Sequence, residues 1–311
     1  MKWFAAISAI AALQFVSVIS APPTVLKRAS VSDVATVGFA TLNGGTTGGA
    51  GGTTTTVTTL DALTSAVSGD RTISGSAVVK VGSNTSVLGA AGSLLDGVGL
   101  RVLDESNVII RNVKIQKVLA DVGDAIVTET TTKTSECDFW HIRTSSEAAE
   151  SSYDGLLDIT HGCYGITVTN SKLYTHWKAS LVGHSDNNGA EDVAIRVTFA
   201  LNWWYDLNSR TPSFRFGHIF NNVYDDNNDG INTRDGAELL VENNVWTGTD
   251  KPLYSTDEGY AVAIGNDFGG AENTADVGTI TASQLGYSYS LIATASVRAT
   301  VEANAGQTLT F

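Results

Sequence analysis

The chain has 311 residues, a formal net charge of −13 at pH 7 and two cysteines. So acidic a chain is not suited to bind nucleic acid or an anionic membrane, and two cysteines exclude a small disulfide-stapled scaffold. The length allows a large hydrophobic core in one or two domains.

The N-terminus has the features of a secreted protein. Residues 1–20, MKWFAAISAIAALQFVSVIS, combine a lysine, an apolar run and a small residue near the end, which predicts a signal peptide. A membrane anchor is the alternative, although the run is barely long enough to span a bilayer. Residues 21–28 end in the dibasic pair Lys27-Arg28, which predicts a propeptide and a secreted mature domain over 29–311. Because residues 1–28 hold three cations and no acid, their removal changes the formal charge from −13 to −16.

The next segments lead into the main body of the domain. The glycine-rich stretch 44–52 predicts a surface loop, and residues 59–69 predict a helix with Leu60, Leu63 and Val67 on one stripe. Asn84 lies in the sequon Asn-Thr-Ser, so we expect it to be glycosylated.

The remainder reads as short β-branched strands with a recurring asparagine. These asparagines are Asn112, Asn170, Asn202, Asn222, Asn244 and Asn266, and the last four are 20, 22 and 22 residues apart. A period near 22 predicts an all-β fold, a single-domain parallel β-helix whose stacked asparagines form a side-chain ladder. The alternative is that asparagine is simply common in turns. Loops at the turns of such a solenoid would stack into a long groove that suits a polymer.

Two aspartates in YDGLLDITHG could share a metal. In an extended strand the Cα atoms of Asp154 and Asp158 would be about 13 Å apart, so they could share one calcium only if the chain bends, for which Gly155 is suited. They could equally be two surface carboxylates.

Two arginines flank a proline in SRTPSFRFG. A planar guanidinium matches a carboxylate with two hydrogen bonds. The odd spacing of Arg210 and Arg215 would send them to opposite faces of a regular strand, unless Pro212 interrupts the alternation. Lys178, in THWKASLVGHSD, could be an ordinary solvated lysine.

Five stretches together resemble the fungal pectate lyases of the pectate/pectin lyase family. They are DGLLDITHG, HWKASLVGHSD, SRTPSFRFGH, DGINTRDGA and KPLYSTDEGYAVA, and the likeness runs from VGFATLNGGTTGG to the terminal AGQTLTF. The resemblance implies a right-handed parallel β-helix with loops forming a substrate groove, and cleavage of polygalacturonate by calcium-dependent β-elimination.

The same resemblance assigns roles to individual residues. Asp154 and Asp158 match the calcium-binding pair, Asp138 matches the acid of the family's WVDH strand, and Asp124 in GDAI matches a further acid near the metal. Lys178 and Arg215 match cations that hold substrate carboxylates, while Arg210 matches the base that removes the C5 proton. Pectin lyases replace the calcium-site acids with an arginine, so the retained acids favour the de-esterified substrate. We expect the protein to act as a monomer.

A calcium ion would explain how an acidic protein binds a polyanion. Calcium and the cations would stabilise the charge that develops next to the C6 carboxylate when C5 loses its proton. An arginine side chain keeps its proton far above neutral pH, so holding one neutral at about pH 9 costs about 5.5 kcal/mol, from about 1.36 kcal/mol for each of about four pKa units. The arginine base therefore predicts an alkaline optimum.

Some features depart from the family or leave alternatives open. The strand SECDFWHIR differs around Asp138, with Phe139 where the family has histidine and His141 as a further imidazole. A polygalacturonase-type hydrolase on the same fold, which uses paired carboxylates, a metal-independent pectin lyase, and a non-catalytic pectin-binding solenoid are the alternative functions. We expect Cys137 and Cys163 to stay unpaired.

Overall fold

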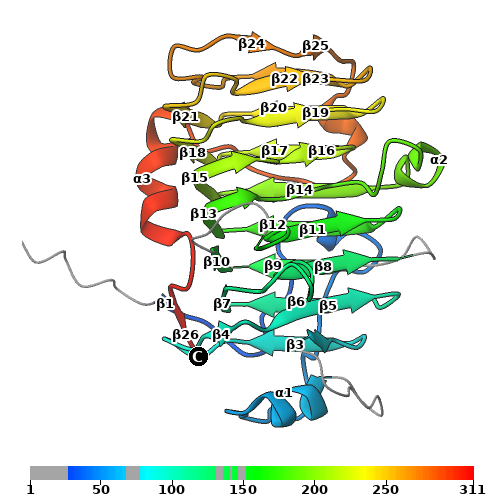
Figure 1. Cartoon of the computed structure of the whole chain (residues 1–311), viewed down its shortest axis with the longest axis vertical. Helices are drawn as coiled ribbons and strands as arrows, with labels where there is room; N and C mark the ends of the chain where they lie inside the picture. The colour runs from blue at the N-terminus through cyan, green and yellow to red at the C-terminus, as the bar shows by residue number, and fades with distance from the viewer. Residues whose placement is uncertain (1–26, 68–77, 131–135, 141, 146–151) are drawn as a thin grey trace, which may run out of the picture.

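The chain folds as one parallel β-helix. A computed structural model describes residues 27–67, 78–130, 136–140, 142–145 and 152–311. Every pairing between two of the named strands in these residues is parallel, and successive coils stack along the long axis of the molecule (Figure 1). The all-β parallel β-helix expected from the sequence is therefore confirmed.

Three walls of parallel β-sheet form the solenoid. The nine-stranded sheet contains, in chain order, β3 (Thr85–Leu88), β6 (Val108–Arg111), β9 (Cys137–Trp140), β12 (Tyr164–Thr169), β14 (Arg196–Ala200), β17 (Gly217–Phe220), β20 (Glu238–Glu242), β23 (Tyr260–Ile264) and β25 (Asp276–Val277). The seven-stranded sheet contains β4 (Leu95–Asp96), β7 (Lys114–Gln116), β10 (Arg143–Ser145), β13 (Lys172–Lys178), β15 (Trp203–Ser209), β18 (Val223–Asp225) and β21 (Val245–Thr247).

The third wall consists of two four-stranded sheets in line. The first contains β2 (Val78–Lys80), β5 (Gly99–Leu103), β8 (Ile126–Glu129) and β11 (Leu157–Thr160). The second contains β16 (Ser213–Phe214), β19 (Ile231–Thr233), β22 (Leu253–Ser255) and β24 (Asn273–Thr274). Isolated parallel bridges from Ile159 to Val182 and from Leu181 to Ser213 join the two sheets. We call this composite surface the third wall.

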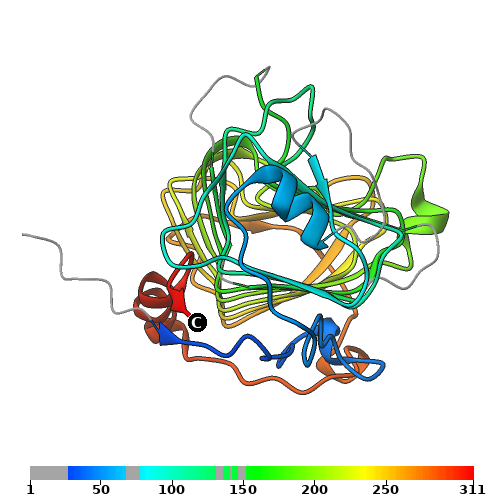
Figure 2. The same cartoon turned by 90° about the horizontal axis from the view of Figure 1, so that it is seen from below.

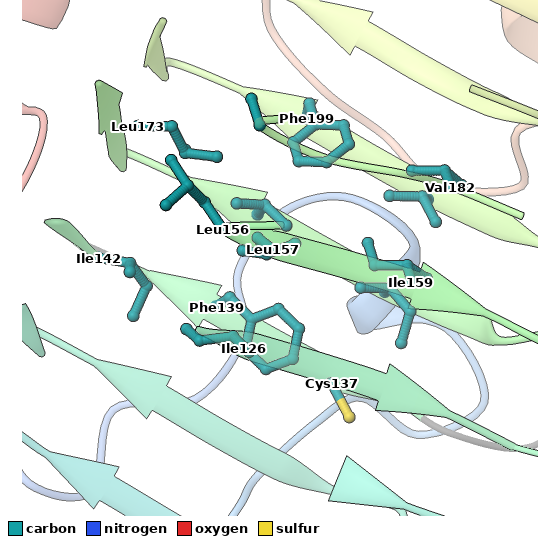
Figure 3. Packing of buried hydrophobic residues seen from close by; sticks show 14 of the residues in the cluster. Ile126, Cys137, Phe139, Ile142, Leu156, Leu157, Ile159, Leu173, Val182 and Phe199 are labelled. Carbon is teal, nitrogen blue, oxygen red and sulfur yellow. The ribbon is translucent and has the colours of Figure 1, made fainter. Parts of the chain in front are cut away.

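The core lies between the walls, where alternate strand residues point inward. Phe139, Leu157 and Phe199, from different coils, meet in this interior (Figure 3). A column of rings extends the core toward the C-terminal coils. Trp204 stacks on Tyr224 with centroids 5.9 Å apart, and Tyr224 on Trp246 at 4.6 Å.

An asparagine ladder runs along one turn, as the 22-residue period predicts. The Nδ2 atom of Asn202 donates to Asn222 Oδ1 at 3.0 Å, Asn222 donates to Asn244 at 2.9 Å, and Asn244 donates to Asn266 at 3.0 Å. Each amide is buried or half-buried and also donates to a main-chain carbonyl of a neighbouring coil.

Asn112 and Asn170 are not rungs of this ladder. They have φ values of 59° and 48° and occupy the turn position just before the rung, where asparagine tolerates the left-handed conformation. Ser171 takes the rung position below Asn202, whose Oδ1 accepts the Ser171 N–H at 2.9 Å. Asparagine therefore occurs at two adjacent turn positions. At the first it adopts the left-handed conformation, and at the second its side chain forms the ladder.

Segments from both ends of the chain cover the outside of the solenoid. Figure 2 shows the N-terminal segment and the segment before α3 (Thr294–Asn304) running along the same side, across the nine-stranded sheet. In the first of these, η1 (Phe39–Thr41) lies on β12, where Ala40 N–H donates to Thr167 Oγ1 at 3.0 Å. The helix α3 packs against β18 and β21, and η2 (Ala282–Gln284) and α2 (Gly189–Asp192) are short.

The expected helix near the N-terminus is present as α1 (Leu60–Val67), which packs against β2 at the end of the solenoid (Figure 1). The predicted signal peptide and most of the predicted propeptide lie outside the described residues. The dibasic pair forms β1 (Lys27–Arg28), which pairs with β26 (Leu309–Thr310).

Two smaller predictions concern a surface asparagine and the two cysteines. Asn84 is exposed in a turn before β3 with φ 56°, a position that a glycan can reach, and its glycosylation stays a prediction. Cys137 and Cys163 are buried and carry free thiols, as expected.

None of the helices in the described part of the chain is long and apolar enough to cross a membrane.

Candidate active site

Asp124, Asp154 and Asp158 come together on the outer side of the third wall. Asp158 lies in β11 between Leu157 and Ile159, which both point into the core, so its side chain faces outward. Asp124 precedes β8, the neighbouring strand, and its Oδ1 accepts the Gly155 N–H. The chain thus folds back so that two of the predicted acids meet across one glycine.

Gly155 explains how the two carboxylates can approach so closely. A Cβ atom on this residue would lie 2.6 Å from Asp158 Oδ1 and 2.7 Å from Asp124 Oδ1. No side chain fits there, so glycine is needed for lateral space rather than for the bend that the sequence suggested. Asp158 Oδ1 also accepts the Leu181 N–H at 2.9 Å, which fixes its rotamer.

Burial and mutual repulsion make these acids hard to ionise without a cation. Burial, followed by repulsion from Asp124, raises the pKa of Asp158 well above its ordinary value. Burial and repulsion from Asp154 likewise raise the pKa of Asp124. A bound cation would relieve both effects.

Among the described residues, Lys178 and Arg210 each have a nitrogen within 4.0 Å of one of these carboxylates, and Arg101 also attracts all three acids. Lys178 Nζ lies 3.9 Å from Asp154 Oδ1, and Arg210 Nη1 lies 3.9 Å from Asp158 Oδ2. Both cations are partly exposed, so each can reach a bound ligand. His176, at the inner side of β13, hydrogen-bonds the main-chain oxygen of Asp154 and so has a structural role.

A pocket of about 210 Å³ opens beside Arg210 along the third wall. Its lining includes His184, Asp186, Arg210, Arg215 and Arg234. The two arginines of SRTPSFRFG therefore reach one pocket, as the sequence required for a joint role. Arg210 itself has φ 57°, so the strand alternation is interrupted at this point.

Arg215 is buried and already has partners. Its guanidinium donates to Ser185 O at 2.7 Å and to Asp235 O at 2.9 Å, and it lies 3.5 Å from an Asp192 carboxylate oxygen. Its role as a substrate-carboxylate ligand stays a prediction, because these partners occupy its donors in the present arrangement.

Arg234 is a pocket residue that the sequence reasoning did not single out. Its Nε donates to Asp235 Oδ2 at 2.8 Å and its Nη2 pairs with Asp186. Arg234 lies in DGINTRDGA, one of the five stretches that resemble the family. That resemblance was the sequence feature that could have indicated a functional role for Arg234. The motif alone did not say that this side chain faces the same pocket as Arg210.

Asp138 does not belong to this group, which corrects the predicted metal site. It lies in β9 of the nine-stranded sheet, between Ile109 and Thr167 of the adjacent strands. Since Cys137 and Phe139 fill the core, Asp138 points to the outside of that sheet, where the N-terminal segment covers its neighbours. Burial raises its pKa to about 7, and Arg111 is the cation that opposes this shift.

The remaining acids fit calcium by chemistry but are not preassembled around an ion. In the described residues no group of three or more His, Cys, Asp or Glu side chains is arranged to hold a metal. Asp124, Asp154 and Asp158 offer only oxygen donors, which calcium prefers. The Asp154 side chain is 43% exposed, against 8% for Asp158, and lies beside Lys178. His141 lies outside the described residues.

Comparison with known proteins identifies the family of the chain. The family profile described as Pectate lyase matches residues 6–309. Pectate lyase A of Aspergillus niger is 52% identical over 328 aligned residues, which cover 100% of this chain and 99% of that protein. Pectate lyase A of Emericella nidulans is 53% identical over 302 residues, covering 92% and 90% of the two chains.

Solved structures give the same result. A pectate lyase from Bacillus sp. N165 in complex with trigalacturonate has a TM-score of 0.76 at 29% identity, covering 88% of this chain and 98% of that chain. Pectate lyase II from Xanthomonas campestris has a TM-score of 0.74 at 25% identity, with the same coverage. The chain therefore belongs to the pectate lyase family, in its fungal branch.

Proposed function

We propose that the protein is a secreted enzyme that cleaves de-esterified α-1,4-polygalacturonate by calcium-assisted β-elimination and releases 4,5-unsaturated oligogalacturonides. The observation that carries this proposal is the meeting of Asp124, Asp154 and Asp158 with Lys178 and Arg210 on one outer surface. The trigalacturonate in the Bacillus relative supports the substrate class. The leader supports secretion.

Asp124, Asp154 and Asp158 would hold the calcium ion. When bound, calcium supplies positive charge that binds the sugar carboxylate and stabilises charge developing beside it. Asp124 and Asp158 are held in place by main-chain donors, so the site is half organised before the ion arrives. A divalent cation would offset the repulsion between these acids more fully than a single positive charge would.

Arg210 would remove the C5 proton of the sugar. Its contact with Asp158 is 3.9 Å long, too long for a hydrogen bond, so the guanidinium is oriented without being fully engaged. Loss of the C5 proton forms the C4–C5 double bond while the C4–O4 bond breaks, and the leaving oxygen accepts a proton.

Lys178 would bind a carboxylate of the polymer next to the metal, and Arg215 would contribute mainly by shaping the pocket. Lys178 is partly exposed beside Asp154, whereas Arg215 is held by Asp192 and main-chain oxygens. The partly exposed Lys178, rather than Arg215, would thus bind the sugar carboxylates.

The products of polygalacturonate distinguish elimination from hydrolysis. Elimination gives a fragment that is lighter by one water than the hydrolytic product and absorbs in the ultraviolet. We expect mass spectrometry of the digest to find unsaturated oligomers. Saturated oligomers alone would favour the polygalacturonase-type alternative, and binding without products would favour a non-catalytic solenoid.

A further inference from the structure

Three cations lie in register on the outer face of the seven-stranded sheet. Arg143 in β10 pairs with Lys114 in β7 on one side and with Lys172 in β13 on the other. Their neighbours Ile115, Thr144 and Leu173 are buried, so the cations alternate to the outside. Adjacent strands are about 4.8 Å apart, and the three charges therefore form a row along the solenoid axis.

Aromatic rings hold two of these cations in place. Lys172 Nζ lies 3.5 Å from the centre of the Trp203 ring, 5.3 Å from that of Tyr174 and 5.4 Å from that of Tyr205. Arg143 Nε donates to the Tyr174 hydroxyl at 3.0 Å. These contacts orient the cations but do not cancel their charge. We call Lys114, Arg143, Lys172, Tyr174 and Tyr205 the cationic strip.

The strip lacks close counter-ions although the chain is strongly acidic. Within the described residues none of its three cations has a carboxylate oxygen within 4.0 Å. Asp225 and Glu302 act on Lys172 from farther away, and burial together with repulsion from Arg143 outweighs them and lowers its pKa. Three uncompensated cations in a chain of net charge −13 are available to an anionic ligand.

The three cations stay at least partly exposed although the C-terminal segment passes close to Arg143 and Lys172. A Cβ atom on Gly306 would lie 3.6 Å from Lys172 Cβ and 3.8 Å from Arg143 Cβ. Arg143 is nevertheless exposed, and Lys114 and Lys172 are half-buried. The segment thus packs on the aliphatic parts, and Arg143 is the most exposed of the three cations.

The strip is separate from the candidate active site but linked to it by one strand. It lies on the wall that carries β7, β10 and β13 (Figure 1), whereas Asp158 lies in β11 of the third wall and Arg210 lies at the turn between β15 and β16. β13 begins with Lys172 in the strip and ends with Lys178 at the acids. Six residue steps of strand span at most about 20 Å, so one long polymer could contact both surfaces.

We propose that the cationic strip is a second binding surface for an acidic polysaccharide, with polygalacturonate as its occupant. Each sugar of this polymer carries one carboxylate, so a chain that runs along the solenoid axis presents a row of anions to a row of cations. The ring faces of the sugars can pack on Tyr174 and Tyr205. The choice of polymer rests on the proposed function. The strip would hold the substrate near the groove and raise its local concentration.

The test is affinity electrophoresis in gels that contain polygalacturonate and a chelator. The variant Lys114→Ser/Arg143→Ser removes two charges, and Lys114→Arg/Arg143→Lys keeps them and serves as the matched control. Lys172 is left in place because it packs on Trp203. We expect the serine variant to bind the polymer at least 5-fold more weakly than wild type, by analogy with charge-driven binding of polyanions, and the control to bind within 2-fold of wild type.

A second readout separates this proposal from the proposed function. With calcium, we expect the serine variant to cleave trigalacturonate as fast as wild type and to cleave dilute long polymer more slowly. If neither the wild type nor the variants cleave either substrate, the proposed function is wrong. The gel experiment still shows whether the cationic strip binds the polymer.

Three results would contradict the proposal that the cationic strip binds polygalacturonate. They are equal retardation of the serine variant and wild type, equal loss of retardation in the charge-preserving control, and equal retardation of wild type by polygalacturonate and by RNA. The last would identify a general polyanion surface rather than one for this polysaccharide.

Discussion

At the scale of single residues, the site depends on which oxygen of each acid is already used. Asp158 directs Oδ1 to the Leu181 N–H and Oδ2 toward Arg210, and Asp124 directs Oδ1 to Gly155. Fixed carboxylates in a partly buried site interact more strongly with a cation than solvated ones do. The same burial makes the site unfavourable for the ionised acids when no cation is bound.

The contrast between Asp124 and Asp138 tests the corrected set of acids. Asp124→Asn removes a charge beside Asp158 and is expected to lower kcat/KM by about 10²-fold, the size of one lost electrostatic partner in a reaction site. Asp138→Asn is expected to leave kcat/KM within about 2-fold, because this residue faces the other side of a different sheet. Steady-state rates on polygalacturonate would show the reverse order if Asp138 were the metal ligand.

Asp138 also predicts a pH dependence of stability. Burial raises its pKa from the ordinary 3.8 to about 7 in the folded protein. Between these values the folded state binds the proton that the unfolded state has lost, so this residue makes stability fall as pH rises. We expect Asp138→Asn to be more stable than wild type at pH 8, and this gain to shrink toward pH 4. A gain that is equal at both pH values in urea unfolding would contradict the assignment.

The sequence identified most of the site residues but not their arrangement. Asp154, Asp158, Lys178 and Arg210 lie together as the resemblance implied. Asp138 was misplaced because the alternation of Cys137 and Phe139 shows that it points outward but not which wall it is on. That depends on turn lengths, which do not follow from local residue pattern.

At the scale of elements, the asparagine ladder fixes the spacing of the last coils. Asn222 Oδ1 accepts from the main chain and side chain of Asn202, and its Nδ2 donates to Phe199 O and Asn244 Oδ1. All these groups are buried, so each lost partner leaves an unsatisfied polar atom. The 20- and 22-residue spacings were readable from the sequence because every rung needs the same amide.

Substitution within the ladder should therefore be costly. Asn222→Ala is expected to lower the free energy of unfolding by about 3 kcal/mol, from the loss of several buried hydrogen bonds. The matched control is Asn228→Ala, whose exposed Nδ2 donates to Asn208 O at 3.2 Å, and it should cost less than about 0.5 kcal/mol. Equal losses for the two variants in denaturant unfolding would mean that the ladder adds no particular stability.

A buried histidine fastens the segment before α3 to the nine-stranded sheet. His218 Nε2 lies 2.9 Å from Glu242 Oε2, and Nδ1 lies 2.7 Å from the Tyr287 hydroxyl. Burial lowers the pKa of His218 below 6.5, and hydrogen bonds from His218 and Tyr289 lower that of Glu242. Neutral His218 then donates to Glu242 and accepts from Tyr287.

Both shifts make this attachment sensitive to acid. A histidine whose folded pKa is lowered contributes stability above its unfolded pKa of about 6.5, and this contribution is lost as pH falls below that value. Glu242 adds a loss in the same direction at lower pH. We expect the melting temperature to fall more between pH 7 and pH 5 in wild type than in His218→Gln, which can form similar hydrogen bonds without titrating. Parallel falls would show that His218 is not the titrating group.

At the scale of the whole molecule, the distribution of charge decides how an acidic protein meets an acidic polymer. The net charge of −13 repels polygalacturonate at long range. Lys178 and Arg210 beside the acids, and the cationic strip on the seven-stranded sheet, are local exceptions to that field. The solenoid fold was predictable because its period repeats, whereas the placement of these patches on different walls required the three-dimensional structure.

The dibasic pair predicts where the mature chain begins. We expect the secreted protein to start at Ala29, so that β1 and its pairing with β26 are absent from the mature form. Intact-mass measurement of the secreted protein checks this, and a mature chain that starts at Ala21 would show that the pair is structural rather than a processing site.

The central claim is that a divalent ion joins Asp124, Asp154 and Asp158 to the sugar carboxylate while Arg210 acts on C5. The most direct measurement follows ultraviolet-absorbing product from polygalacturonate before chelation, after chelation and after calcium is returned. The account predicts that turnover disappears with the chelator and returns with calcium. Undiminished formation of unsaturated product by fully metal-stripped enzyme would contradict it.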